Sequence, residues 1–276
     1  MDMGRFSLYN GLTESSALGR EGGMFMDGSS QGGETGKGLT SNAIKLIAIA
    51  AMTLDHVTWL LFPGCQHLLW VMGLHLLGRI TAPIMWFFLA EGFHYTRNPK
   101  KYAGRLFLFA VISHFAYNFA GGISLIPSGF FNQTSVMWSL AWSVVLMMAV
   151  SDEEKPLWQK LLLIFFVCLI TFPADWSCVA AMCPVFLYSH RGDFKRQCLD
   201  LLIWTFLYGL VYFAAMDPAY GVLQLGTLLS IPILRSYNGS RGRGRYMKWL
   251  FYIYYPAHLF LLGILRLLMG AESIFP

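Results

Sequence analysis

Long apolar runs constrain the fold of this chain more than any other feature of its sequence. Most are about 16 to 25 residues long, the length of a helix that spans a lipid bilayer. Charged residues make up 13% of the 276 residues, about half the fraction typical of a soluble protein. The runs lack the alternation of a membrane β-strand, so we predict an all-α polytopic membrane protein.

The apolar runs predict about nine transmembrane helices, of which the sixth is short and open to a re-entrant interpretation. The predicted spans are residues 43–62, 68–93, 102–120, 134–150, 158–173, 176–189, 199–216, 219–235 and 248–269.

Residues 1–40 differ in kind from the rest of the chain. They hold ten of the 27 glycines and no long apolar run, and they lack the basic start and apolar core of a signal peptide. Such a segment buries too little apolar surface to offset the entropy of folding. We therefore predict a flexible cytoplasmic tail, followed by one transmembrane domain over residues 41–270.

The basic residues indicate the orientation of the predicted spans. When the tail and every second loop are assigned to the cytoplasm, these segments hold 18 of the 20 Lys and Arg residues, and the external loops hold none. The two others, Arg79 and Arg266, fall within spans. The positive-inside rule then places the N-terminus inside and the C-terminus outside.

Ionisable residues inside the predicted spans are the first candidates for a functional site, because they are costly in a bilayer. Asp55, His56, Arg79, His114 and His258 lie on four spans at depths that converge near the bilayer midplane. Adjacent helix positions do not face each other. We therefore expect Asp55 to pair with Arg79 and His56 to face a substrate. A purely structural polar cluster is the alternative.

Other polar residues give weaker signals. Glu91 and Arg97 share one helical stripe near the cytoplasmic end of the second span, where solvation, pairing with the basic loop and a functional role are all open. Asp175 falls in a predicted external turn, where an acidic residue needs no special role. The spacing of Cys178 and Cys183 misses the common metal-ligand patterns, and we expect no metal.

Several motifs of this chain resemble the TraX family, in order, over about residues 41–266. They are the segment from Asn42 to His56, Gly78-Arg79-Ile-Thr-Ala-Pro83, Glu91-Gly92-Phe93, the loop from Thr96 to Tyr102, Tyr237-Asn-Gly-Ser-Arg-Gly242 and Tyr254-Tyr-Pro-Ala-His-Leu259. The resemblance implies a membrane acetyltransferase that uses acetyl-CoA and is located in the inner (cytoplasmic) membrane of a bacterium. The family is named for a conjugation protein that acetylates the N-terminus of pilin. Family members often have Asn near the start of the fourth span, where this chain has Ser135-Val-Met-Trp-Ser139.

The wider membrane acyltransferases, to which this family is similar, carry a basic residue and a histidine in the first span with ten residues between them. Lys45 and His56 have that separation and would lie about 16 Å apart on one helix face. We expect Lys45, with Arg97 and Arg241, to bind acetyl-CoA.

The expected roles of the other candidates follow from the same comparison. His56 would act as the general base, because acyl transfer needs a group that takes a proton from the attacking hydroxyl or amine. Asp55 and Arg79 would support it, and His258 or His114 would be the second polar partner. Glu91 and Ser135 are the candidates for contact with the acceptor, which could be a peptide, a sugar or a lipid.

Two other functions remain open from the sequence. A midplane Asp/His/Arg cluster also suits a proton-coupled transporter, and the chain could be a non-catalytic membrane subunit. No internal repeat supports the transporter. The expected partners are acetyl-CoA, the acceptor and membrane lipids, with a homo-oligomer left open and no nucleic acid.

Overall fold

The computed structural model describes residues 38–126, 133–244 and 247–271, and every named element in these ranges is helical. They contain eleven α-helices and one 3₁₀ helix, besides two isolated β-bridges. The all-α prediction is confirmed. Residues 1–37 of the predicted tail lie outside the described residues.

Each predicted span corresponds to one helix or to a group of consecutive short helices. The second span is divided between α2 and α3, and the eighth is made of α9, η1 and α10. The elements are α1 Ser41–Leu61, α2 Leu69–Gly78, α3 Thr81–Tyr95, α4 Pro99–Gly121, α5 Val136–Val150, α6 Leu157–Thr171, α7 Val179–Ser189, α8 Phe194–Ala215, α9 Pro218–Leu223, η1 Gln224–Leu229, α10 Ser230–Arg235 and α11 Met247–Met269.

Four helical segments are long and apolar enough to cross a membrane. They are Ser41–Leu61, Leu69–Tyr95, Phe194–Ala215 and Trp249–Met269. The apolar helices α5, α6 and α7 are shorter than a full span. These segments support a membrane protein, whereas the count of nine spans still rests on the sequence.

Local sequence signals explain where several helices begin. Thr40 caps α1, its side chain accepting a hydrogen bond from the backbone N–H of Ala43. Asn98 caps α4 in the same way and is followed by Pro99, which suits the first helical position. Asp193 caps α8. These capping residues therefore mark where the preceding segments end and the three helices begin.

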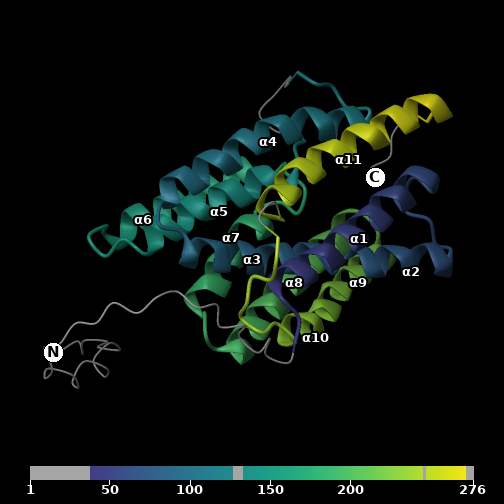
Figure 1. Ribbon diagram of the computed structural model, residues 1–276. Helices are drawn as coiled ribbons and strands as arrows, with labels where there is room; N and C mark the ends of the chain where they lie inside the picture. The colour runs from purple at the N-terminus through teal and green to yellow at the C-terminus, as the bar shows by residue number, and fades with distance from the viewer. Residues whose placement is uncertain (1–37, 127–132, 245–246, 272–276) are drawn as a thin grey trace, which may run out of the picture. The chain divides into compact units, whose positions relative to one another are not determined.

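The helices pack side by side in the order that Figure 1 shows: α4 lies between α11 and α5, α5 contacts α7, and α7 contacts α3 and α8. Helix α7 is well enclosed, with most of its residues buried. Helices α6 and α8 instead expose large apolar side chains such as Phe165 and Phe206. Such exposed apolar faces are suited to contact with lipid.

The loop between α6 and α7, residues 172–178, has an unusual backbone. Trp176 and Ser177 adopt left-handed φ angles of 62° and 49°, which are rare for residues other than glycine. The loop is held on both sides, because the backbone N–H of Asp175 donates to the carbonyl of Thr134 at 2.9 Å and the Ser139 hydroxyl donates to the carbonyl of Ser177 at 3.1 Å.

Candidate functional site

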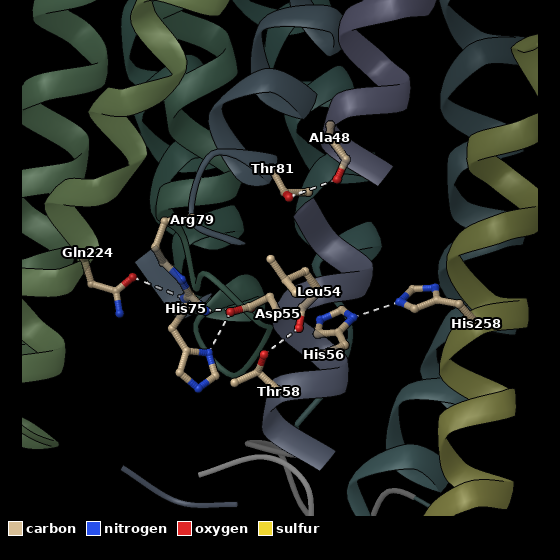
Figure 2. A network of polar contacts seen from close by, with 10 residues as sticks. All are labelled: Ala48, Leu54, Asp55, His56, Thr58, His75, Arg79, Thr81, Gln224 and His258. Carbon is tan, nitrogen blue, oxygen red and sulfur yellow. Dashed lines mark hydrogen bonds and ion pairs between the residues drawn. The ribbon is translucent and has the colours of Figure 1, made fainter. Parts of the chain in front are cut away.

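Helix α1 supplies two adjacent polar residues, Asp55 and His56, that point to different sides. Figure 2 shows Asp55 directed toward His75 and Arg79, and His56 directed toward His258 on α11. This divergence follows from the rotation of about 100° between successive helix positions. The predicted separation of the two side chains is confirmed.

Asp55 accepts hydrogen bonds from two basic side chains. Arg79 donates to Oδ2 at 2.7 Å, as the sequence predicted, and Nδ1 of His75 lies 2.8 Å from Oδ1. Arg79 also donates to the side-chain oxygen of Gln224 at 3.3 Å. Sequence reasoning missed the His75 contact, although positions 75 and 79 are four apart and share a helix face.

Gly78 allows α2 to approach α1 at Asp55. A Cβ atom placed on Gly78 would lie 2.6 Å from Cγ of Asp55, closer than real Cβ atoms come to other atoms. Helix α2 ends at this glycine, and Arg79 and Ile80 separate it from α3. Gly78 therefore permits the close approach of α2 to α1 that places the Arg79 guanidinium beside the Asp55 carboxylate.

His56 and His258 form a second polar pair. Nδ1 of His56 lies 2.8 Å from Nε2 of His258, and the two rings stack with centroids 5.0 Å apart. Nδ1 of His258 lies 3.0 Å from the carbonyl oxygen of Tyr254, which can only accept, so this nitrogen carries the proton. Nε2 of His258 then accepts from Nδ1 of His56. In a neutral pair, Nε2 of His56 keeps its lone pair.

A cavity of about 600 Å³ connects these groups with the start of α1. Lys45, Asp55, His56 and Arg79 all line it, whereas His258 lies behind His56 and does not. The volume is within the usual range of small-molecule sites. Lys45 and His56 thus share one cavity, as expected for residues on one face of a helix.

Lys45 lies among aromatic rings and beside a second cation. Its ammonium is 5.1 Å from the centre of the Phe88 ring and 5.7 Å from that of Phe251, and Arg241 is near enough to act on it electrostatically. Among the described residues, Lys45 forms no ion pair with a carboxylate. Arg97 is exposed and lies outside the cavity lining.

Asp175 is part of this cavity, which corrects its interpretation as an ordinary turn residue. The loop 172–178 contributes Asp175, Trp176 and Ser177 to the lining. Outside the helices, protein burial raises the pKa of the Asp175 carboxyl to about 6, against an opposing effect of Arg79. No local feature of the sequence distinguishes Asp175 from an ordinary turn residue.

Four other predicted site residues also do not line the cavity: Glu91, His114, Ser135 and Arg241. His114 contacts Thr134 and Asn118 through its two ring nitrogens, at 3.0 and 3.2 Å. Ser135 is fully buried and is not among the lining residues, although its neighbour Val136 is.

Glu91 forms an ion pair with Arg191 outside the cavity lining. Arg191 donates to its two carboxylate oxygens at 2.7 and 3.3 Å and also to the Tyr95 hydroxyl at 2.9 Å. In this loop after α7, the hydrogen bond to Glu91 raises the pKa of Arg191. The geometry favours a structural role for Glu91, since its carboxylate is satisfied within the protein.

Comparison with known proteins supplies an independent finding. Residues 40–266 match the family described as TraX protein. The chain is 33% identical over 232 residues to a protein of Dichelobacter nodosus named "Probable fimbrial assembly protein FimC, serogroup H1". The matched region covers 79% of this chain and 92% of that relative. No solved structure matches.

Proposed function

Since this chain belongs to the TraX family, we propose that it is a membrane-embedded acyltransferase that moves an acetyl group from acetyl-CoA to an acceptor hydroxyl or amine. One observation carries the proposal: a single cavity is lined by both Lys45 and His56, and His56 is hydrogen-bonded to His258. A donor with anionic phosphates at one end and a reactive thioester at the other needs these two groups at separate ends of one space.

The residues at the Lys45 end suit the phosphates of acetyl-CoA. Lys45 and Arg241 are close to each other, and within the described ranges neither has a carboxylate partner. A phosphate between them would relieve their repulsion and accept their hydrogen bonds. When bound, acetyl-CoA supplies the activated acetyl group, and a helix rise of 1.5 Å per residue places His56 about 16 Å further along α1.

The histidine pair suits the proton transfer. Nε2 of His56 would accept the proton of the attacking hydroxyl or amine, while His258 holds the required tautomer through Nδ1 of His56. As the acceptor oxygen or nitrogen forms its bond to the acetyl carbonyl carbon, the C–S bond of the thioester would break, and the CoA thiolate would leave with the proton that His56 returns. A positive charge on His56 would be shared through the same hydrogen bond. Arg79 lines the cavity and would stabilise negative charge that develops on the acetyl oxygen.

The relative's name favours a protein acceptor. That protein is named for fimbrial assembly, so we propose that the acceptor of this chain is a subunit of a cell-surface filament. We further propose nine spans in a bacterial inner membrane, with the N-terminus and the Lys45 end on the cytoplasmic side. The distribution of 18 of the 20 basic residues supports this orientation.

One observation favours the rival transporter: the helix interruption at Arg79 and Ile80 occurs beside the Asp55 carboxylate. Interrupted helices at charged residues are typical of transport sites. Lys45 distinguishes the two functions, because a proton path through Asp55 and Arg79 does not need a phosphate site at the end of the cavity.

The decisive experiment gives purified protein radiolabelled acetyl-CoA and a membrane extract of its host. We expect label to enter a protein band, and the His56→Gln variant to leave that band unlabelled. If both proteins transfer the label equally after correction for the hydrolysis of acetyl-CoA, the assignment of His56 is contradicted. Absence of CoA binding by the folded wild-type protein would favour the transporter.

A further inference from the structure

Two of the five cysteines, Cys168 and Cys178, lie in contact at the junction of α6 and α7. Cys168 is in the last turn of α6, and Cys178 directly precedes α7. Their thiols are hydrogen-bonded to each other, and neither residue is fully buried. A disulfide needs Cβ atoms about 3.8 Å apart, and thiols in hydrogen-bond contact are near that arrangement.

The backbone on both sides of the thiol pair is fixed by hydrogen bonds. At the end of α6, the carbonyl of Thr171 accepts from the N–H of Ala174 at 3.1 Å. The carbonyl of Ala174 accepts from Ser177 at 2.7 Å, and that of Cys178 accepts from Met182 at 2.9 Å. The contact between the thiols therefore follows from how the end of α6, the loop and the start of α7 are held together.

Ser177 makes the two thiols chemically different. Its side chain donates a hydrogen bond to the sulfur of Cys178. The thiolate is the nucleophile in thiol–disulfide exchange, and a hydroxyl donor beside a sulfur stabilises the thiolate. Cys178 is therefore suited to attack first, with Cys168 as the thiol that completes the disulfide.

The segment between the two cysteines is a wall of the cavity. All six residues of 172–177 contribute to its lining. The left-handed φ angles of Trp176 and Ser177 directly precede Cys178. Such backbone strain persists only where the surroundings over-determine the conformation. A covalent bond between residues 168 and 178 would restrict the loop further, because it closes a short ring around it.

We propose that Cys168 and Cys178 are a redox site, whose disulfide forms by exchange with a disulfide compound on the external side and locks the loop 172–178 in place. In the proposed orientation this loop faces the external compartment, and disulfides persist in the oxidising periplasm of bacteria. The inference goes beyond acetyl transfer and does not require it.

The exchange is balanced in two steps. The sulfur of Cys178 attacks one sulfur of the external disulfide, the S–S bond of that compound breaks, and its first thiol leaves with the proton of Cys178. The sulfur of Cys168 then attacks the sulfur of Cys178 in this mixed disulfide. The second external thiol leaves with the proton of Cys168. Two protein thiols are oxidised, and one external disulfide is reduced to two thiols.

Thiol counting on the full chain in nanodiscs tests the site. Both faces of a nanodisc are open to reagents, so the result does not depend on the proposed orientation. The protein is incubated with glutathione disulfide or with dithiothreitol, denatured, and labelled with a maleimide polymer. All five thiols should react after dithiothreitol. After glutathione disulfide two fewer should react, and mass spectrometry should find the peptides of Cys168 and Cys178 linked.

Hydrogen exchange tests whether the disulfide locks the loop. The amides of residues 172–178 should exchange about tenfold more slowly, or slower still, in the oxidised protein than in the reduced one. The wild-type comparison needs no variant, because both samples have one sequence. Cys178→Ala should lose no thiol to the disulfide and show no effect of the oxidant on the loop. Cys198→Ala on α8 is the matched control and should behave like the wild-type protein.

Each outcome decides one part of the inference. If all five thiols still react, if the linked peptides contain other cysteines, or if glutathione stays attached to single cysteines, the redox site is overturned. A Cys168–Cys178 disulfide that leaves hydrogen exchange in the loop unchanged overturns the lock. Acetyl-CoA binding, measured on the same reduced sample, shows separately whether the acyltransferase proposal holds.

Discussion

Nδ1 of His56 lies 2.8 Å from Nε2 of His258, and the carbonyl oxygen of Tyr254 lies 3.0 Å from the other ring nitrogen of His258. This order of acceptors fixes the tautomers along the whole chain of hydrogen bonds. A carbonyl cannot donate, so each proton points from His56 toward His258 and from His258 toward Tyr254. The nitrogen of His56 that remains basic is therefore Nε2.

The two histidines should respond differently to substitution. His56→Gln should lower acetyl transfer about 10²- to 10⁴-fold, the usual effect of losing a general base. At position 258, Gln offers an oxygen that can accept from Nδ1 of His56, whereas Leu leaves that donor unpaired, so His258→Leu should be about tenfold slower than His258→Gln. Initial rates with labelled acetyl-CoA measure both. Equal rates for the two position-258 variants would contradict the assigned tautomer.

Asp55 and Arg79 should be coupled in stability. Either Asp55→Asn or Arg79→Met leaves one buried partner without its counter-charge, and such a loss typically costs about 3 to 5 kcal/mol of the free energy of unfolding. The double variant should lose clearly less than the sum of the two single losses. Thermal unfolding in detergent gives the comparison. Simple additivity would mean that the contact at 2.7 Å contributes no interaction energy.

Gly78→Ala should disrupt the same cluster by crowding. The added methyl group would meet the side chain of Asp55, and the close helix contact leaves little room to move. Overpacking of this kind typically costs about 1 to 3 kcal/mol. Gly73→Ala is the matched control, since nothing lies within 4 Å of a Cβ at that position on the same helix. Thermal unfolding that is equal in the two variants would show that α1 and α2 can separate without cost.

The sequence predicted the helical elements well because apolar length and polar caps are local signals. The runs around α1, α4, α8 and α11 agree with the observed helices to within a few residues. The divisions of the second and eighth spans were not predicted, since they depend on packing: Arg79 leaves the helix where α2 contacts α1, and η1 lies against α8.

The site was predicted in part for a similar reason. Ionisable residues within an apolar span can be recognised from the sequence alone, which is why we identified Asp55, His56, Arg79 and His258. Asp175 was missed, since nothing local reveals that the loop between two short helices enters the cavity. The estimated depth in the bilayer also selected His114, but its ring contacts Thr134 and Asn118 and not the other candidate residues.

Topology can be tested at the two ends of one helix. Position 100 lies in the first turn of α4 and position 124 just beyond its end, about 35 Å apart for 23 residues. In a variant whose five native cysteines are replaced by Ala, a cysteine at position 100 should react only after the membrane is permeabilised. A cysteine at position 124 should react from outside. External labelling at position 100 would reverse the proposed orientation.

Lys45 provides the sharpest test of an enzyme against a transporter. A lysine near the end of a spanning helix commonly serves as an anchor whose ammonium reaches the membrane surface. The structure gives Lys45 a different environment, because its ammonium faces the cavity between Phe88 and Phe251 and close to Arg241. Two cations without a carboxylate partner among the described residues repel each other unless an anion joins them.

The expected result follows from that repulsion. Lys45→Arg keeps the charge and adds donors for phosphate, so acetyl-CoA affinity should change little. Lys45→Gln should weaken acetyl-CoA binding and make the remaining affinity less sensitive to salt, because one charge–charge contact that salt screens is lost. Lys195→Gln, an exposed lysine in the first turn of α8, is the control and should behave like the wild-type protein. Calorimetric titration with acetyl-CoA at two salt concentrations measures the difference. Equal affinities for Lys45→Gln and Lys195→Gln would reduce Lys45 to an anchor and remove the main support for a phosphate site at this end of the cavity.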